Sequence, residues 1–140
     1  MQIKINDPPR EFIVGKNNDL VIKDCAHVSL DFDEQVTFET DVGGEYDVAR
    51  KEWGFYLTPS INGRLVNHGF KTALIRNSQG NYYLFLVEQD KQQSFYQYLE
   101  DEGLAICGWF NQGSLKVVEQ ALKNQEDQEP NGDRLAEADA

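Results

Sequence analysis

The sequence predicts an α+β domain, with an antiparallel, strand-rich N-terminal half followed by a β-β-α-β-α half packed on the same core. Short runs of β-branched and aromatic residues separated by turn formers fill the first half, and helical spacing of apolar residues appears only after residue 90. A chain of 140 residues suffices for one domain of ordinary size. We therefore expect a single α+β domain over residues 1–123.

The first half is predicted to consist of strands joined by tight turns. Three short segments are rich in β-branched and aromatic residues, namely residues 11–14, 20–22 and 27–32. A hairpin is predicted over residues 36–48, because apolar and polar residues alternate on both sides of Gly43-Gly44, which supplies the positive φ of a tight turn. A further strand over residues 53–57 ends before Pro59, which cannot donate to a ladder.

The second half opens with two predicted strands, residues 72–76 and 82–88, which flank the polar loop of residues 77–81. The segment Tyr82–Val87 is apolar at every position. Such a strand is typical of the middle of a sheet covered on both faces, or of the wall of a filled barrel. We therefore expect this strand to occupy one of these two positions.

Two helices are predicted to surround one more strand. Asp90, followed three residues later by Gln93, indicates a capping box, and Gly103 stands where a C-cap glycine belongs, so we expect a helix over residues 91–102. Residues 104–110 return as a strand, and Ser114 is expected to cap the last helix. We expect these helices to pack against one face or one end of the sheet.

Charge is distributed unevenly along the chain. The whole chain has 24 acidic and 13 basic residues, a net charge of -11. Residues 124–140 hold six acids, one base and no aromatic residue, too little apolar surface to offset the entropy of ordering, so we expect a disordered acidic tail there. Residues 24–52 hold nine acids and two bases, whereas residues 53–87 hold three bases and no acid. The body thus has two electrostatic halves.

Composition argues against several classes of protein. A nucleic-acid binder with this charge would need a strong basic patch, and the basic residues do not interleave with the aromatic ones. The apolar runs are too short for a membrane helix, and no segment resembles a leader for export. We therefore expect a cytoplasmic protein with no nucleic-acid or membrane partner. Cys25 and Cys107 are predicted to be buried apolar residues rather than a disulfide.

Recognisable catalytic and cofactor motifs are missing as well. The histidines His27 and His68 lie outside any metal-binding motif. At Asp24, Cys25 and His27 we favour a buried cysteine beside a surface or core histidine over a metal site. No glycine-rich nucleotide loop and no nucleophile motif occurs. We therefore predict no metal and no cofactor, and leave catalysis undecided.

The segment from residue 45 to residue 65 combines charge, aromatic rings and loop formers more densely than the rest of the chain. Arg50 or Arg64 would clamp a carboxylate or phosphate, and Trp53 or Tyr56 would stack on a sugar or base. The candidate ligand-binding residues are Tyr46, Arg50, Trp53, Tyr56, Arg64 and His68. In the competing interpretation, Trp53 and Phe55 are core residues, and Arg50 pairs with Asp47 or Glu52.

The same segment, together with Asp24-Cys25, residues 33–38 and residues 82–88, resembles a family of small uncharacterised bacterial proteins associated with surface-polysaccharide gene clusters. The resemblance covers roughly residues 8–110. It implies a cytoplasmic role close to nucleotide-sugar or glycan assembly, as an accessory or ligand-binding protein, and it implies no catalytic residues.

Three functions remain open from the sequence. The first is an accessory protein that binds a small polar ligand or a partner protein. The second is a small sugar-modifying enzyme that uses acid/base residues such as Asp47, Tyr56 or His68. The third is an acidic protein-interaction module. The sequence does not determine the oligomeric state.

Overall fold

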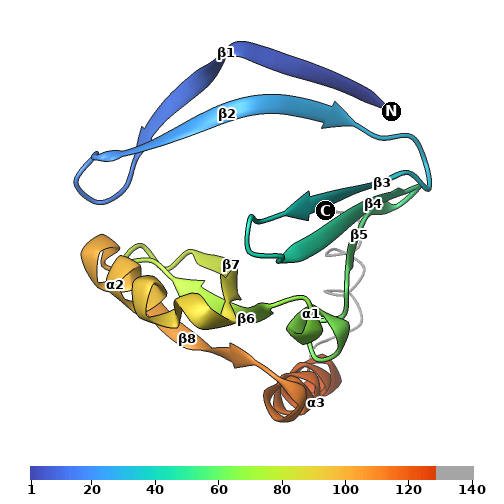
Figure 1. The fold of residues 1–140 in the computed structure, drawn as a ribbon. Helices are drawn as coiled ribbons and strands as arrows, with labels where there is room; N and C mark the ends of the chain where they lie inside the picture. The colour runs from blue at the N-terminus through green and yellow to red at the C-terminus, as the bar shows by residue number, and fades with distance from the viewer. Residues whose placement is uncertain (129–140) are drawn as a thin grey trace.

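A computed structural model describes residues 1–128 of the chain (Figure 1). Over this range, eight strands form three small antiparallel sheets, accompanied by three α-helices and one 3-10 turn. The predicted α+β class is confirmed.

The first sheet is one long hairpin of β1 (Gln2–Val14) and β2 (Leu20–Ser29), which arches over the other elements in Figure 1. The sequence predicted only the separate short pieces 11–14, 20–22 and 27–32. Pro8 and Pro9 concealed the start of β1, because proline cannot donate to a ladder. The structure accommodates them by shifting the register between Ile5 and Arg10.

The second sheet joins β3 (Gln35–Glu39), β4 (Glu45–Lys51) and β5 (Gly54–Thr58) in chain order. The predicted hairpin across Gly43-Gly44 is confirmed, with Gly43 at φ +94° as the turn requires. Trp53 lies in the turn before β5 and is 71% exposed, so the prediction that it belongs to a strand and to the core was wrong. Phe55 is exposed as well. A two-residue period cannot distinguish a face covered by another element from one left open.

The third sheet has the order β7-β6-β8, formed by β7 (Tyr82–Glu88), β6 (Phe70–Arg76) and β8 (Ala105–Phe110). The predicted hairpin across residues 77–81 is confirmed. The central strand is β6, so the expectation that Tyr82–Val87 lies in the middle of a sheet was wrong. Within β7, Val87 is buried and Phe85 packs against the core, whereas Tyr82, Tyr83 and Leu84 are exposed.

The helices follow the predicted order, with differences at their caps. Helix α2 (Gln92–Glu102) follows the 3-10 turn η1 (Gln89–Lys91) and ends at Gly103, whose φ of +64° is the left-handed conformation expected of a C-cap. The Asp90 side chain makes no cap hydrogen bond, because the 3-10 turn places Lys91 at the N-cap of α2. A short helix, α1 (Arg64–Asn67), was not predicted.

The last helix, α3 (Gln112–Gln128), begins earlier and ends later than predicted. It therefore includes residues 124–128, which were expected to be disordered. A helix satisfies its own backbone without a core, and the side-chain bonds Glu119–Lys123 (2.8 Å) and Gln120–Asn124 (2.8 Å) support its last turns. The remainder of the predicted tail lies outside the described residues.

The core lies between α2 and the third sheet. Its buried residues are Ala73, Ile75, Val87, Phe95 and Leu99, with Phe85, Leu104 and Trp109 packed against them. The Phe95 ring meets Phe85 and Trp109 edge to face, with centroids 6.3 and 5.6 Å apart. This core covers one face of the sheet and holds Trp109 firmly at the end of β8.

Both cysteines, Cys25 and Cys107, are exposed and free, so the prediction that they are buried was wrong. Cys25 lies on the β1–β2 hairpin, and Cys107 lies on the edge strand β8. None of the helices in residues 1–128 is both long and apolar enough to cross a membrane.

Candidate functional site

Strand β4 carries two of the candidate residues, Tyr46 and Arg50, on one face. Arg50 donates hydrogen bonds to the carbonyl oxygens of Lys51 and Gly54, and its guanidinium lies 5.0 Å from the centre of the Phe32 ring. The expected ion pair of Arg50 with Asp47 or Glu52 is not formed. Partial burial raises the pKa of the Tyr46 phenol above its ordinary value.

The other candidates point elsewhere. Tyr56 lies opposite Ala49, and strand alternation therefore places it on the face of Asp47, away from Tyr46 and Arg50. Asp47 itself accepts a hydrogen bond of 2.6 Å from the Thr37 hydroxyl. The six candidates are thus divided between two faces of the second sheet, the turn at Trp53 and the neighbourhood of α1.

His68 and Arg64 flank α1. The Nδ1 atom of His68 lies 3.6 Å from the Glu45 carboxylate at the start of β4, whereas Arg64 is exposed at the first position of the helix. No candidate residue lines the pocket described below.

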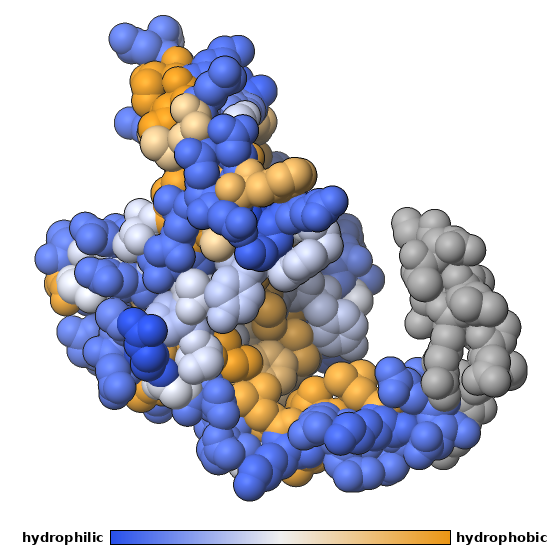
Figure 2. Space-filling view, turned by 90° about the vertical axis from the view of Figure 1, so that its right-hand side faces the viewer, coloured by the Kyte–Doolittle hydropathy of each residue, from blue (hydrophilic) through white to orange (hydrophobic). Residues whose placement is uncertain are grey.

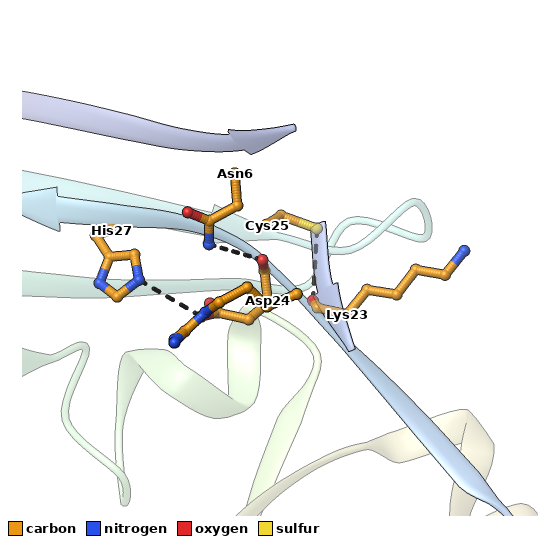
Figure 3. A network of polar contacts seen from close by, with 6 residues as sticks. Asn6, Lys23, Asp24, Cys25 and His27 are labelled. Carbon is orange, nitrogen blue, oxygen red and sulfur yellow. Dashed lines mark hydrogen bonds and ion pairs between the residues drawn. The ribbon is translucent and has the colours of Figure 1, made fainter. Parts of the chain in front are cut away.

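The Asp24, Cys25 and His27 cluster on β2 is arranged for structure rather than for metal binding (Figure 3). Arg10 donates two hydrogen bonds to Asp24 Oδ2, of 2.5 and 3.1 Å, and His27 Nε2 lies 3.5 Å from the same oxygen. The Cys25 thiol instead points toward the Lys23 carbonyl oxygen. Within the described part of the chain, no group of three His, Cys, Asp or Glu residues is placed to hold a metal ion.

A better-formed site lies where the third sheet, α1 and the start of α3 meet. We call it the Trp109 pocket, and its volume is about 330 Å³. In the space-filling view, apolar side chains gather in the hollow above the lower arm formed by α3 (Figure 2). The pocket is lined by Ile61, Asn62, Val66, Lys71, Trp109, Phe110, Asn111 and Gln112.

Local hydrogen bonds fix the turn from β8 into α3. The Asn111 side chain accepts from the Ser114 amide at 2.9 Å, and the Ser114 hydroxyl oxygen accepts from the Asn111 amide at 2.8 Å. This is a reciprocal capping box, with Asn111 as the cap and Ser114 as its partner, so the prediction that Ser114 itself is the cap was wrong. The Ser114 hydroxyl also donates to the Trp109 carbonyl oxygen at 2.7 Å, which ties the helix to the pocket wall.

The opposite wall is fixed in a similar way. The Asn62 amide donates to the Gln112 side-chain oxygen at 2.6 Å, which joins the loop before α1 to α3. Gln89 donates to the Val66 carbonyl oxygen at 2.9 Å and thereby holds α1 against the third sheet. Several of the pocket's polar groups are therefore already positioned in the free chain.

Electrostatically, the Trp109 pocket contrasts with the rest of this acidic chain. Its only charged lining residue is Lys71, whose ammonium lies 5.7 Å from the centre of the Trp109 ring. The pocket thus offers one cation, two aromatic rings and three side-chain amides, and no carboxylate. A ligand with an anionic group and a flat ring matches this set.

Sequence reasoning found only part of this site. The chosen segment of residues 45–65 contributes Ile61 and Asn62, whereas Lys71, Trp109 and Gln112 come from later elements. The absence of acids in residues 53–87 was the one signal that pointed to Lys71. No spacing rule connects that stretch to Trp109, which the pairing of β6 with β8 brings beside it.

The β1–β2 hairpin presents an apolar face that no other element covers. Residues directly opposite each other share a face, and the pairs Ile3–Val28, Ile5–Ala26, Phe12–Ile22 and Val14–Leu20 fall on the same one, on either side of the ion-paired Arg10 and Asp24. The large residues Ile3, Ile5, Phe12, Val14, Ile22 and Val28 are 40–67% exposed. We call this set of eight residues the hairpin apolar face.

Two polar contacts hold this hairpin in place at its ends. At its tip, the Lys16 amide donates to the Glu102 carboxylate at 2.6 Å, and at its base the Met1 amine lies 2.9 Å from Glu34. These contacts orient the hairpin without covering its apolar face.

Comparison with protein-family models, with curated protein sequences and with solved structures finds no match to this chain. The relationship to proteins of surface-polysaccharide gene clusters therefore stays a prediction.

Proposed function

We propose that the chain is an accessory binding protein whose Trp109 pocket takes a small anionic ligand that carries a flat ring. The observation on which the proposal rests is the Lys71 ammonium above the Trp109 ring, in a pocket whose lining includes no carboxylate. A cation beside an aromatic face favours a ligand that offers a phosphate or carboxylate together with a ring.

Nucleotides and nucleotide sugars are the ligand class that uses every feature of this pocket. A phosphate would pair with Lys71, a base or sugar would stack on the exposed part of Trp109 or Phe110, and hydroxyl groups would bond the amides of Asn62 and Gln112. The volume of about 330 Å³ is at the lower end for ligand pockets, so part of such a ligand would extend into solvent. This class also agrees with the role that the sequence resemblance implies.

The test measures ligand binding directly, by fluorescence and by calorimetry. Trp53 is exposed, so a Trp53→Phe background leaves Trp109 as the only tryptophan and makes its fluorescence report on the pocket. Uridine diphosphate sugars, uridine monophosphate and inorganic phosphate are the probes. A nucleotide that binds the folded chain should change this fluorescence and raise the melting temperature.

Matched variants identify the site. Lys71→Gln removes the cation and should raise the Kd of the nucleotide by roughly ten- to a hundredfold, because a charge-assisted bond contributes about 1.5–3 kcal/mol. Arg76→Gln removes a cation at the far end of the same strand and should leave the Kd unchanged. No response to any probe, or equal binding by Lys71→Gln and the parent chain, would contradict the proposal.

A second candidate function, docking of a partner protein, is favoured by the hairpin apolar face. Exposed apolar side chains that gather on one face are typical of an interaction site. Ile5→Asp introduces a charge on that face and should abolish capture of a specific partner, whereas Lys23→Asp on the polar face should retain it. Equal capture by both variants would contradict this function.

A further inference from the structure

Strand β7 forms an open edge of the third sheet. It pairs with β6 through all seven of its residues without a register shift, and among the described strands β6 is its only partner. The edge is apolar apart from Glu88 at its end, and Leu84 is 62% exposed. Long, flat, apolar edges without lysine, proline or a bulge are where another strand adds.

The flanking hydrogen bonds show which backbone groups of β7 are free. The Gln89 amide donates to the Gly69 carbonyl oxygen, and the Asn77 amide donates to the Asn81 carbonyl oxygen, both at 2.9 Å. The odd-numbered residues of β7 therefore direct their backbone N–H and C=O groups toward β6. By antiparallel alternation, Leu84 and Leu86 direct theirs outward, where an added strand would pair with them.

A groove runs along this same edge, between β7 and α2, with a volume of about 520 Å³. Residues 84–88 form one wall, and Lys91, Ser94 and Tyr98 belong to the opposite side. The Phe85 ring lies in the groove, 6.5 Å from the Tyr98 ring. The groove has room for apolar side chains of a strand placed beside β7.

The opposite edge of the sheet differs. Strand β8 pairs with β6 through a register shift between Leu74 and Ile75 and contains Gly108 at that point. An irregularity of this kind bends an edge and disfavours the addition of a strand. Only the β7 edge is therefore suited to continuous pairing.

We propose that β7 of a second copy of this chain occupies this edge, antiparallel, with the Phe85 residues of the two copies facing each other. This register is the one in which Leu84 of each copy lies opposite Leu86 of the other, so that the outward backbone groups meet. Glu88 then lies opposite Tyr82 rather than opposite another carboxylate. The remaining cross-strand pairs are Tyr83 with Val87 and Phe85 with Phe85. The two Phe85 rings lie side by side on the face covered by α2, where each packs against Tyr98 of its own copy. The two third sheets become one sheet of six strands.

The choice of a second copy over an unrelated peptide rests on this self-complementarity. An isologous contact requires one patch to match itself. The free backbone groups restrict β7 to registers that pair its even-numbered residues, and of these only the register centred on Phe85 pairs all seven residues of the strand with each other. Because each copy carries a net charge of -11, repulsion opposes the contact. Added salt should therefore strengthen the dimer by screening that repulsion.

The experiment measures mass by sedimentation across a wide concentration range. The chain should pass from 16.0 kDa to twice that mass as concentration rises. Leu84→Lys should raise the dimer Kd by about tenfold or more, because an ammonium would be buried in an apolar seam. The matched control Ile106→Lys places the same charge on the β8 edge and should dimerise like the parent chain.

A second variant and a second readout keep the test decisive. Leu86→Pro removes an outward amide hydrogen together with the Leu86 side chain and should also give a monomer, with folding of each variant checked by circular dichroism. Hydrogen exchange should show the Leu84 and Leu86 amides becoming protected as the dimer forms. A chain that stays monomeric, a dimer in which these amides exchange freely, or a Leu84→Lys variant that dimerises normally would each overturn the proposal.

Discussion

Thr72, in the middle of β6, offers a sharp test of how this sheet is stabilised. It is 1% exposed, lies opposite Leu86 and Phe110 on the two neighbouring strands, and its hydroxyl has no hydrogen-bond partner. We predict that Thr72→Val stabilises the chain, although it deletes a polar group from the centre of the only central strand of the third sheet.

The magnitude follows from the removal of an unpaired hydroxyl. Burial of such a group without a partner costs about 1–3 kcal/mol, and valine fills the same volume with a methyl group. Both residues suit a strand, so the backbone cost is unchanged. We expect the free energy of unfolding to rise by about 1–2 kcal/mol, which corresponds to an increase in melting temperature of roughly 3–8 °C for a chain of this size.

Urea unfolding in the Trp53→Phe background measures this change, because Trp109 fluorescence then reports on the third sheet itself. Thr72→Ser is the matched control, since it keeps the unpaired hydroxyl and deletes the methyl group, and it should lower the free energy of unfolding by about 1 kcal/mol. A Thr72→Val variant less stable than the parent would refute the reasoning, because it would mean that the hydroxyl forms a hydrogen bond in the folded chain.

Three further predictions concern local features. Gly103→Ala should lower the free energy of unfolding by about 1 kcal/mol in chemical denaturation, because φ +64° strains any residue with a Cβ, and an unchanged value would contradict the left-handed cap. Asn111→Ala should lower the free energy of unfolding by about 1 kcal/mol and reduce the helicity measured by circular dichroism. Ser114→Ala removes the other half of the capping box and should change both quantities in the same direction. The hydrogen bond from Arg10 lowers the pKa of Asp24 below its ordinary value of 3.8. The stabilisation that ionised Asp24 gives the folded chain is therefore complete above pH 3.8 and is lost as the pH falls through the lowered pKa. An NMR titration should give a midpoint below 3.8 that returns toward this value in Arg10→Gln, and an ordinary midpoint in the parent chain would contradict the pairing.

Turn chemistry explains why part of the fold was predictable. The hairpin at Gly43-Gly44, the loop of residues 77–81 and the helix end at Gly103 each depend on the conformational preferences of a few adjacent residues. These signals act over short distances in the chain and need no knowledge of the packing around them.

Burial was predicted poorly for a different reason. Both cysteines were expected to be buried, and one interpretation placed Trp53 and Phe55 in the core, yet all four side chains are exposed. Trp53, Phe55 and Cys25 belong to the first two sheets, and Cys107 lies on β8 at the edge of the third. A sequence pattern shows that a face is apolar, but it does not show what covers the face. If β7 pairs with a second copy, its double-sided apolar pattern is explained by an interface rather than by a central position.

The sequence by itself determined the α+β class, the order of most elements and the contrast between acidic and acid-free stretches, because periodicity, turn residues and charge are properties of neighbouring positions. Only the tertiary structure decided the strand order β7-β6-β8 and the site at Trp109. The physical reason is that Asn62, Lys71 and Trp109 meet through the pairing of β6 with β8 and through the capped turn into α3, and these contacts join residues that no sequence period relates.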